Sequence, residues 1–172
     1  MNIKEAILEE HSKAQRDRIV KYIGTDKKRF KELLDLFLGS EYRVTQRAAW
    51  AVSSCAELYP ELIKPYLNKL VDNLDLPDQH DAVKRNTLRI FQFMDVPEKS
   101  QGKLYDISLR FLLSMHEPIA IKAFSITVLQ NLALVYPDLQ QELKVIFSDL
   151  AKHETSPAVV HRAKKALKEF NK

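Results

Sequence analysis

The sequence contains very few of the residues that form tight turns. Among its 172 residues there are three glycines. Because glycine is the residue that most readily adopts the left-handed turns of β-hairpins, so low a number disfavours a fold built from hairpins. The length is sufficient for one substantial core. We therefore expect an all-α fold, with residues 1–172 forming a single domain.

Long apolar runs are missing as well, and there is one cysteine. No run approaches the roughly 20 residues that a membrane-spanning helix needs, and the N-terminal MNIKEAILEEH lacks the basic stretch and apolar core of a secretory signal. These absences predict a cytoplasmic protein that does not bind membranes. Cys55 cannot form an internal disulfide, and its place among apolar positions predicts a buried, unreactive thiol.

The sequence does contain an internal repeat. Val44, Val83, Ile121 and Val159 follow one another at steps of 39, 38 and 38 residues. A period in this range is typical of stacked helical or strand units, each of which needs a neighbour to bury its apolar face. Three further apolar columns keep the same register: Ala51/Ile90/Val128/Ala166, Val52/Phe91/Leu129/Leu167 and Cys55/Met94/Leu132/Phe170.

Apolar residues spaced three and four apart predict amphipathic helices. One set of helices carries these columns, and the other set lies in the segments between them. Eight of the helices are expected to form four antiparallel pairs, over 26–58, 65–95, 99–135 and 138–171. The segment 1–24 falls outside the columns and is predicted to cap the stack. A short turn is expected at 60–63, and Ser156 is expected to cap the last helix. The predicted helices are 2–22, 26–38, 42–58, 65–75, 80–95, 99–114, 118–135, 138–152 and 157–171.

The second helix of each pair resembles that of HEAT repeats, which opens on an acidic turn, a valine and a basic residue. Asp81-Ala-Val83-Lys84 carries this pattern, and Ile121-Lys122-Ala123 and Val44 through Ala49 carry parts of it. The resemblance covers residues 26–171. It implies a right-handed α-α superhelix of about four helix pairs that acts as a non-catalytic scaffold for a protein partner.

Three segments are also similar to a group of short bacterial HEAT-like proteins without an assigned activity, some of which carry an adenylosuccinate lyase label. These segments are Gln46–Trp50, Pro60–Pro65 and Arg85–Arg89. Enzymes of the lyase superfamily resemble one another in a flexible Ser-Ser-x-Met-Pro-x-Lys-x-Asn loop. This sequence contains no such loop. We therefore expect no lyase activity.

Other signatures of enzymes are missing too: there is no phosphate-binding glycine loop, dinucleotide fingerprint, nucleophile elbow or zinc-binding His-Glu helix. The histidines are scattered, with His80, His116 and His153 about one repeat apart, so convergence on one metal ion is not expected. The sequence thus predicts no catalytic residue, no metal site and no cofactor.

One face of helix 42–58 is the better candidate for function. The apolar side of this helix places Gln46, Trp50 and Ser53 on the opposite, polar side. The equivalent positions of the next repeat are Arg85, Arg89 and Gln92. An exposed tryptophan among arginines has the composition of a binding hot spot. In the alternative interpretation, Trp50 packs against the N-terminal helix while Arg47 and Asn86 form hydrogen bonds that hold the repeats together.

Nucleic acid is the alternative partner, because the net charge is +4 and HEAT-like folds occur in DNA alkylation-repair glycosylases. Arg47, Arg85, Arg89, Lys122, Lys165 and Lys168 could then contact phosphates, with binding that weakens steeply with salt. However, most of the positive excess lies in residues 1–39 and 153–172. We favour a protein partner of unknown identity, bound by a monomer.

Overall fold

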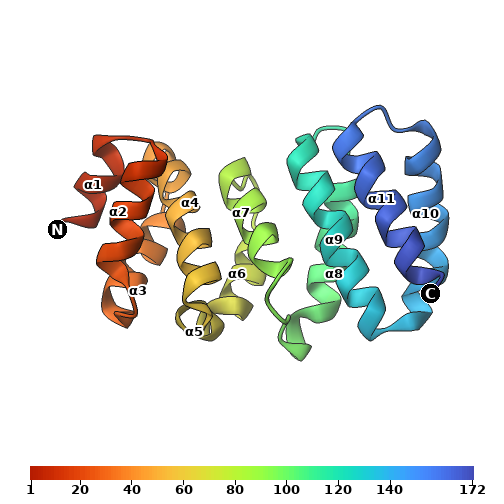
Figure 1. The fold of residues 1–172 in the computed structure, drawn as a ribbon, viewed down its shortest axis with the longest axis horizontal. Coiled ribbons are helices and arrows are strands. Elements are labelled where there is room, and N and C mark those ends of the chain that lie inside the picture. The colour runs from red at the N-terminus through yellow and green to blue at the C-terminus, as the bar shows by residue number, and fades with distance from the viewer. The chain divides into compact units, whose positions relative to one another are not determined.

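The computed structural model describes residues 1–172 and contains helices and turns but no strand (Figure 1). The helices gather into two compact units, Met1–Pro97 and Glu98–Lys172. The all-α prediction is confirmed. The single domain expected over the whole chain stays a prediction, and each unit is described by itself below.

The first unit is built around α4 (Tyr42–Leu58). This helix packs against α3 (Lys27–Phe37), its antiparallel partner, and against α7 (Asp81–Phe91) of the next pair. Between α4 and α7 the chain forms a helical turn, α5 (Pro60–Ile63), a 3-10 turn at Lys64–Tyr66, and α6 (Leu67–Leu74). The short turn expected at 60–63 is confirmed, with Pro60 in the first turn, where a missing N–H costs nothing.

The N-terminal segment differs from the prediction. Instead of one helix over 2–22 it forms two, α1 (Ile3–Glu9) and α2 (Lys13–Ile23). The reason is local, because Ser12 adopts extended backbone and its hydroxyl accepts a hydrogen bond from the N–H of Gln15, which starts a new helix. Both helices pack on α4, and Ile3, Ile7 and Ile19 are buried beneath them.

The second unit contains two antiparallel pairs. α8 (Glu98–Leu113) packs against α9 (Ile119–Val135), and α10 (Gln140–His153) packs against α11 (Pro157–Phe170). α9 also packs against α11, so the second helices of the two pairs lie side by side. A 3-10 turn, Pro137–Leu139, joins the pairs.

The start of α11 was predicted with the right boundary but the wrong cap. Ser156 has the extended backbone of an N-cap residue, yet its side chain makes no capping hydrogen bond. In the turn before the helix, a carboxylate oxygen of Glu154 accepts hydrogen bonds from the backbone N–H groups of Ser156 and Thr155. These bonds favour the ionised carboxylate, and they lower the pKa of Glu154.

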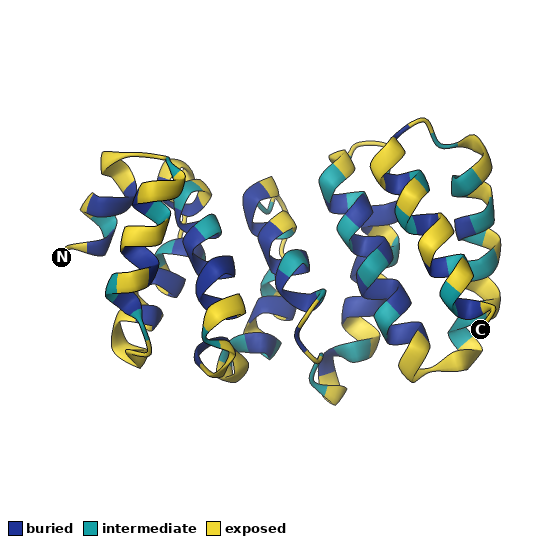
Figure 2. Cartoon of the chain, in the orientation of Figure 1, coloured by how far each residue is buried: buried dark blue, intermediate teal, exposed yellow.

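The repeat columns form the cores of the two units, as predicted. Val44 and Val83 are buried in the first unit, and Ile121 and Val159 are buried in the second. Figure 2 shows the consequence, because α4 and α9 are buried along most of their length while the helix ends and turns are exposed. Among the members of these four columns, Leu167 alone is half-buried.

Cys55 lies in one of these columns and is fully buried on α4. Burial raises the pKa of its thiol from 9.0 to about 12, so the group stays a neutral thiol in the folded protein. We expect a disulfide reagent at pH 8 to modify Cys55 at least about 100-fold more slowly in the native protein than in guanidinium chloride. Fast modification of the native protein would contradict the burial.

The same shift fixes the sign of a pH effect. An unfolded cysteine loses its proton near pH 9, whereas the folded one retains it until about pH 12. The contribution of Cys55 to stability is therefore fully present below pH 9 and is lost as the pH rises through that window.

Candidate protein-binding surface

The six residues predicted to bind a partner all lie in the first unit, on α4, on α7 and, for Gln92, at the C-cap of α7. The structure leaves Gln46 and Arg85 exposed, and it leaves Trp50, Arg89 and Gln92 partly exposed. Ser53 is fully buried. We call the exposed side of these two helices the α4–α7 face, and it comprises Arg43, Gln46, Trp50, Glu57, Arg85, Arg89 and Gln92.

Trp50 is half-buried because the N-terminal helices cover part of it. The guanidinium of Arg16, on α2, lies 4.5 Å from the centre of the indole ring. The ring of His11 approaches edge-on, with its centroid 5.9 Å away. Both features proposed for Trp50 from the sequence are therefore present: it packs against the N-terminal helices, and part of its ring still faces outward.

In the alternative interpretation Arg47 and Asn86 hold the repeats together, and of the two only Asn86 has such a bond, because its side-chain oxygen accepts from the hydroxyl of Ser53 on α4. A guanidinium N–H of Arg47 donates to the backbone oxygen of Leu8 at 2.8 Å, which joins α4 to the end of α1. The amide of buried Asn86 donates to the backbone oxygen of Ala82 at 2.9 Å. Arg47 thus belongs to the packing of the N-terminal helices.

The prediction that Ser53 lies on the binding surface is wrong. Its hydroxyl lies 3.2 Å from the side-chain oxygen of Asn86, across the contact between α4 and α7. It also lies 3.1 Å from the backbone oxygen of Trp50. Helical periodicity put Ser53 on the polar side of α4, but α7 packs over that flank because a small side chain leaves room for a neighbouring helix.

The charges on the α4–α7 face are unequally compensated. Arg89 pairs with Glu57 across the two helices, with 3.3 Å between the closest nitrogen and oxygen atoms. Arg85 is exposed, lies one turn before Arg89 and makes no ion pair or hydrogen bond within the protein. The exposed Arg43 on α4 is likewise without an internal partner. The uncompensated charges of this face are therefore positive.

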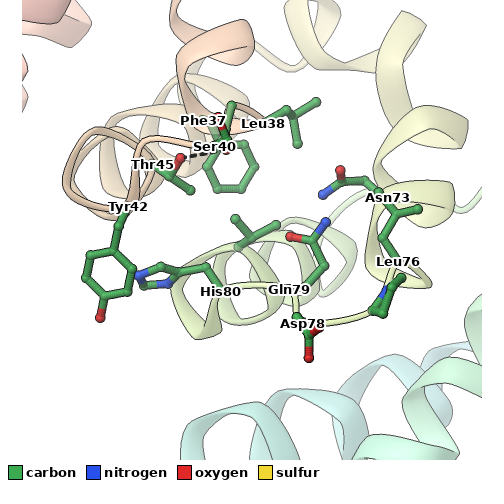
Figure 3. Close-up of a pocket in the computed structure, with 13 residues that line it drawn as sticks. Phe37, Leu38, Ser40, Tyr42, Thr45, Asn73, Leu76, Asp78, Gln79 and His80 are labelled. Atoms are coloured by element: carbon green, nitrogen blue, oxygen red, sulfur yellow. Dashed lines mark hydrogen bonds between the residues drawn. The ribbon is translucent and has the colours of Figure 1, made fainter.

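A second feature of the first unit escaped the sequence analysis. A cleft of about 410 Å³ lies between the α3–α4 turn and the loop that precedes α7 (Figure 3). Phe37, Leu38 and Val83 contribute its apolar lining, while Tyr42, Asn73 and His80 contribute rings and polar groups. The sequence analysis did not find this cleft, because periodicity carries no information about which turns meet.

No group of three or more histidine, cysteine or carboxylate side chains comes close enough to hold a metal ion. His80 is the N-cap residue of α7, and its Nδ1 accepts a hydrogen bond from the N–H of Ala82 at 2.9 Å. That histidine thus has a structural role in its helix.

Comparison with known proteins agrees with the pattern of paired helices. A family model described as a HEAT repeat domain matches residues 3–170. The chain belongs to the HEAT repeat family. The match includes the N-terminal helices α1 and α2, which the sequence columns left out. No curated protein and no solved structure matches this HEAT repeat protein.

Membership of this family indicates a protein-interaction scaffold in general terms, and HEAT repeat proteins are typically not enzymes. A HEAT repeat domain presents helices whose outer residues are free to vary while the apolar columns keep the stack together. In addition, none of the helices combines the length and the hydrophobicity needed to cross a bilayer.

Proposed function

We propose that this HEAT repeat protein is a non-catalytic cytoplasmic scaffold that binds an acidic segment of a partner protein through the α4–α7 face. The observation that carries the proposal is the half-exposed Trp50, held under the guanidinium of Arg16 on a face whose uncompensated charges are positive. Tryptophan and arginine are the residues most enriched in binding hot spots.

The packing of Trp50 against the N-terminal helices supports this role. Contact with Arg16 and His11 fixes the indole in one orientation before a partner arrives. A side chain that is already ordered loses less conformational entropy on binding, so more of its contact energy remains as affinity. The uncompensated Arg85 and Arg43 supply the positive potential that would attract a carboxylate-rich segment.

Nucleic acid is the less favoured partner of this face. DNA binding depends on several cations that contact phosphates along the duplex. Here the carboxylate of Glu57 neutralises the charge of Arg89, and the guanidinium of Arg47 donates a hydrogen bond to the backbone oxygen of Leu8. A DNA mobility shift that weakens steeply between 50 and 200 mM salt, roughly as expected for several phosphate contacts, would replace the present proposal.

The decisive variant is Arg85→Glu. Trp50→Ala would also remove contacts to α2, so its effect on binding would be mixed with an effect on folding. Arg85 has no internal partner, and exposed substitutions of this kind usually change stability by less than about 0.5 kcal/mol. We expect Arg85→Glu to lose the proteins captured from a native lysate by the tagged wild-type chain, while the melting temperature stays unchanged.

Lys164→Glu provides the matched control, because it makes the same charge reversal at an exposed position of α11 in the other unit. It should retain the captured proteins. If Arg85→Glu captures the same proteins as the wild type, or if both variants lose them equally, binding does not depend on the α4–α7 face.

A further inference from the structure

The second unit contains a groove of about 440 Å³ beside the N-terminal half of α8. The end of α9 and the 3-10 turn that follows it supply the rest of the lining. The groove is large enough to hold a side chain of a partner together with the residues on either side of it. Its lining residues are Glu98, Gln101, Gly102, Tyr105, Asp106, Leu132, Tyr136, Asp138 and Leu139.

Aromatic and apolar side chains form the base of this groove. Tyr105 and Leu132 are buried, whereas Tyr136 is 44% exposed. The hydroxyl of Tyr105 donates a hydrogen bond to a carboxylate oxygen of Glu142 at 2.8 Å, and the hydroxyl of Tyr136 donates to the side-chain oxygen of Gln101. Because both hydroxyls donate within the protein, the tyrosines offer a ligand the apolar surface of their rings.

Gly102 leaves open space in the wall of the groove. It lies inside α8 with ordinary helical backbone, where glycine is less favourable than alanine. A methyl group added at Gly102 would meet no atom within 4 Å. Neither the backbone conformation nor the packing of α8 therefore requires a glycine at this position. Its missing side chain keeps the groove open up to the helix backbone.

The charges that line the groove are all negative. Glu98, Asp106 and Asp138 are exposed, and none of them forms an ion pair or a hydrogen bond within the protein. No lysine or arginine lines the groove. An anion would be repelled by three carboxylates, whereas a cation would supply the charge that they lack. The groove thus matches a positive group that is carried on an apolar stem.

Arginine matches this groove better than lysine does. A guanidinium is more weakly hydrated than an ammonium, stacks on aromatic rings such as that of Tyr136, and pairs with a carboxylate through two parallel hydrogen bonds. Its apolar stem can lie along the base of the groove. From this geometry we infer that the groove binds an arginine side chain, flanked by apolar residues, in a segment of a partner protein.

The groove belongs to the second unit, whereas the α4–α7 face belongs to the first. The inference therefore does not rest on the proposed function, and its failure would leave that function untouched.

Two blocked peptides that differ only in charge test the inference. One has the sequence Gly-Leu-Arg-Leu-Gly, and the other contains citrulline, the neutral isostere, in place of arginine. We expect the arginine peptide, titrated into the full chain, to give saturable NMR shifts of the backbone amides of Gly102, Tyr136 and Leu139. The citrulline peptide should bind at least about tenfold more weakly, as expected for the loss of a charge-assisted pair. Equal binding of the two peptides, or no saturable shift with the arginine peptide, would overturn the inference.

A third peptide, with lysine in place of arginine, tests the choice of cation. It should bind more weakly than the arginine peptide, because its ammonium is more strongly hydrated and cannot stack as a plane. Equal or tighter binding of the lysine peptide would reject the assignment to arginine.

Gly102→Leu separates binding from folding. Leucine is a better helix former than glycine, and its side chain would enter open space, so the melting temperature should equal or exceed that of the wild type. The same side chain would fill the groove, and affinity for the arginine peptide should fall at least about tenfold. Full affinity in Gly102→Leu would show that the peptide binds elsewhere.

Asp106→Asn tests the contribution of the charges. Removal of this one exposed carboxylate should weaken binding of the arginine peptide about threefold, in line with a solvent-exposed pair. Asp149→Asn is the matched control, because it makes the same change at an exposed position of α10 outside the groove. It should leave the affinity unchanged. Equal losses in the two variants would attribute the attraction to the overall charge of the unit and would reject the groove as the site.

Discussion

Phe91→Ala should lower the free energy of unfolding of the first unit by about 3–5 kcal/mol, the range measured for phenylalanine truncation in packed cores. Phe91 is 1% exposed and ends α7, in the same repeat column as Val52. Its removal takes away apolar contacts and also leaves a cavity that the surrounding helices can fill only in part. A loss of this size is a large fraction of the stability of an ordinary domain.

Trp50 gives the measurement, because it is the only tryptophan and lies in the first unit. Urea denaturation followed by its fluorescence reports on residues 1–97. Phe93→Ala is the control, since Phe93 lies two residues further along and is 44% exposed. It should cost less than about 1 kcal/mol, in proportion to the smaller apolar area that it buries. Equal losses for the two variants would show that the repeat column does not determine the core.

Ser53→Arg is the second substitution with a large expected effect. Ser53 is fully buried between α4 and α7, and its hydroxyl faces Asn86. An arginine there would have to force the helices apart and would bury a charge at a position that now holds a small, neutral hydroxyl. Overpacking and an uncompensated buried charge together should cost about 3–5 kcal/mol.

Gln46→Arg makes the matched change two turns earlier on the same helix, at an exposed position. It should alter stability by less than about 0.5 kcal/mol. Thermal and urea denaturation of the two variants then test directly which polar positions of α4 are covered by α7. If Ser53→Arg is as stable as Gln46→Arg, Ser53 lies at the surface as the helical periodicity alone suggested.

The sequence predicted the position of a helix correctly where an apolar column coincides with a proline that marks the start of the helix. Pro60 and Pro157 start helical segments in the structure as expected. The break at Ser12 was missed because the segment around it is polar throughout, so no change of periodicity marks the end of α1. Ser156 lies at the N-cap position as expected but makes no capping hydrogen bond, because a favoured residue at the right position does not ensure that its hydroxyl reaches the N–H groups of the first turn.

The candidate surface was predictable in part, for a related reason. Periodicity identifies the side of α4 that faces α3, and it correctly left Gln46 on the outside. It cannot identify the flanks, where neighbouring helices of other pairs pack. Trp50, Ser53 and Gln46 occupy the same polar side of one helix. Yet Arg16 of α2 and His11 of the turn before it cover part of the first, α7 covers the second, and the third is exposed.

The order of residues by itself determined the helical class, the repeat of 38 or 39 residues and the apolar columns, because these depend on spacings along one chain and on the need of each helix to bury a stripe. Only the tertiary structure decided that Ser53 is internal, that Trp50 lies under Arg16, and that Asn73 and His80 share a cleft. Those outcomes depend on which surfaces of non-adjacent segments meet, and a repeat period does not specify the packing of turns and flanks.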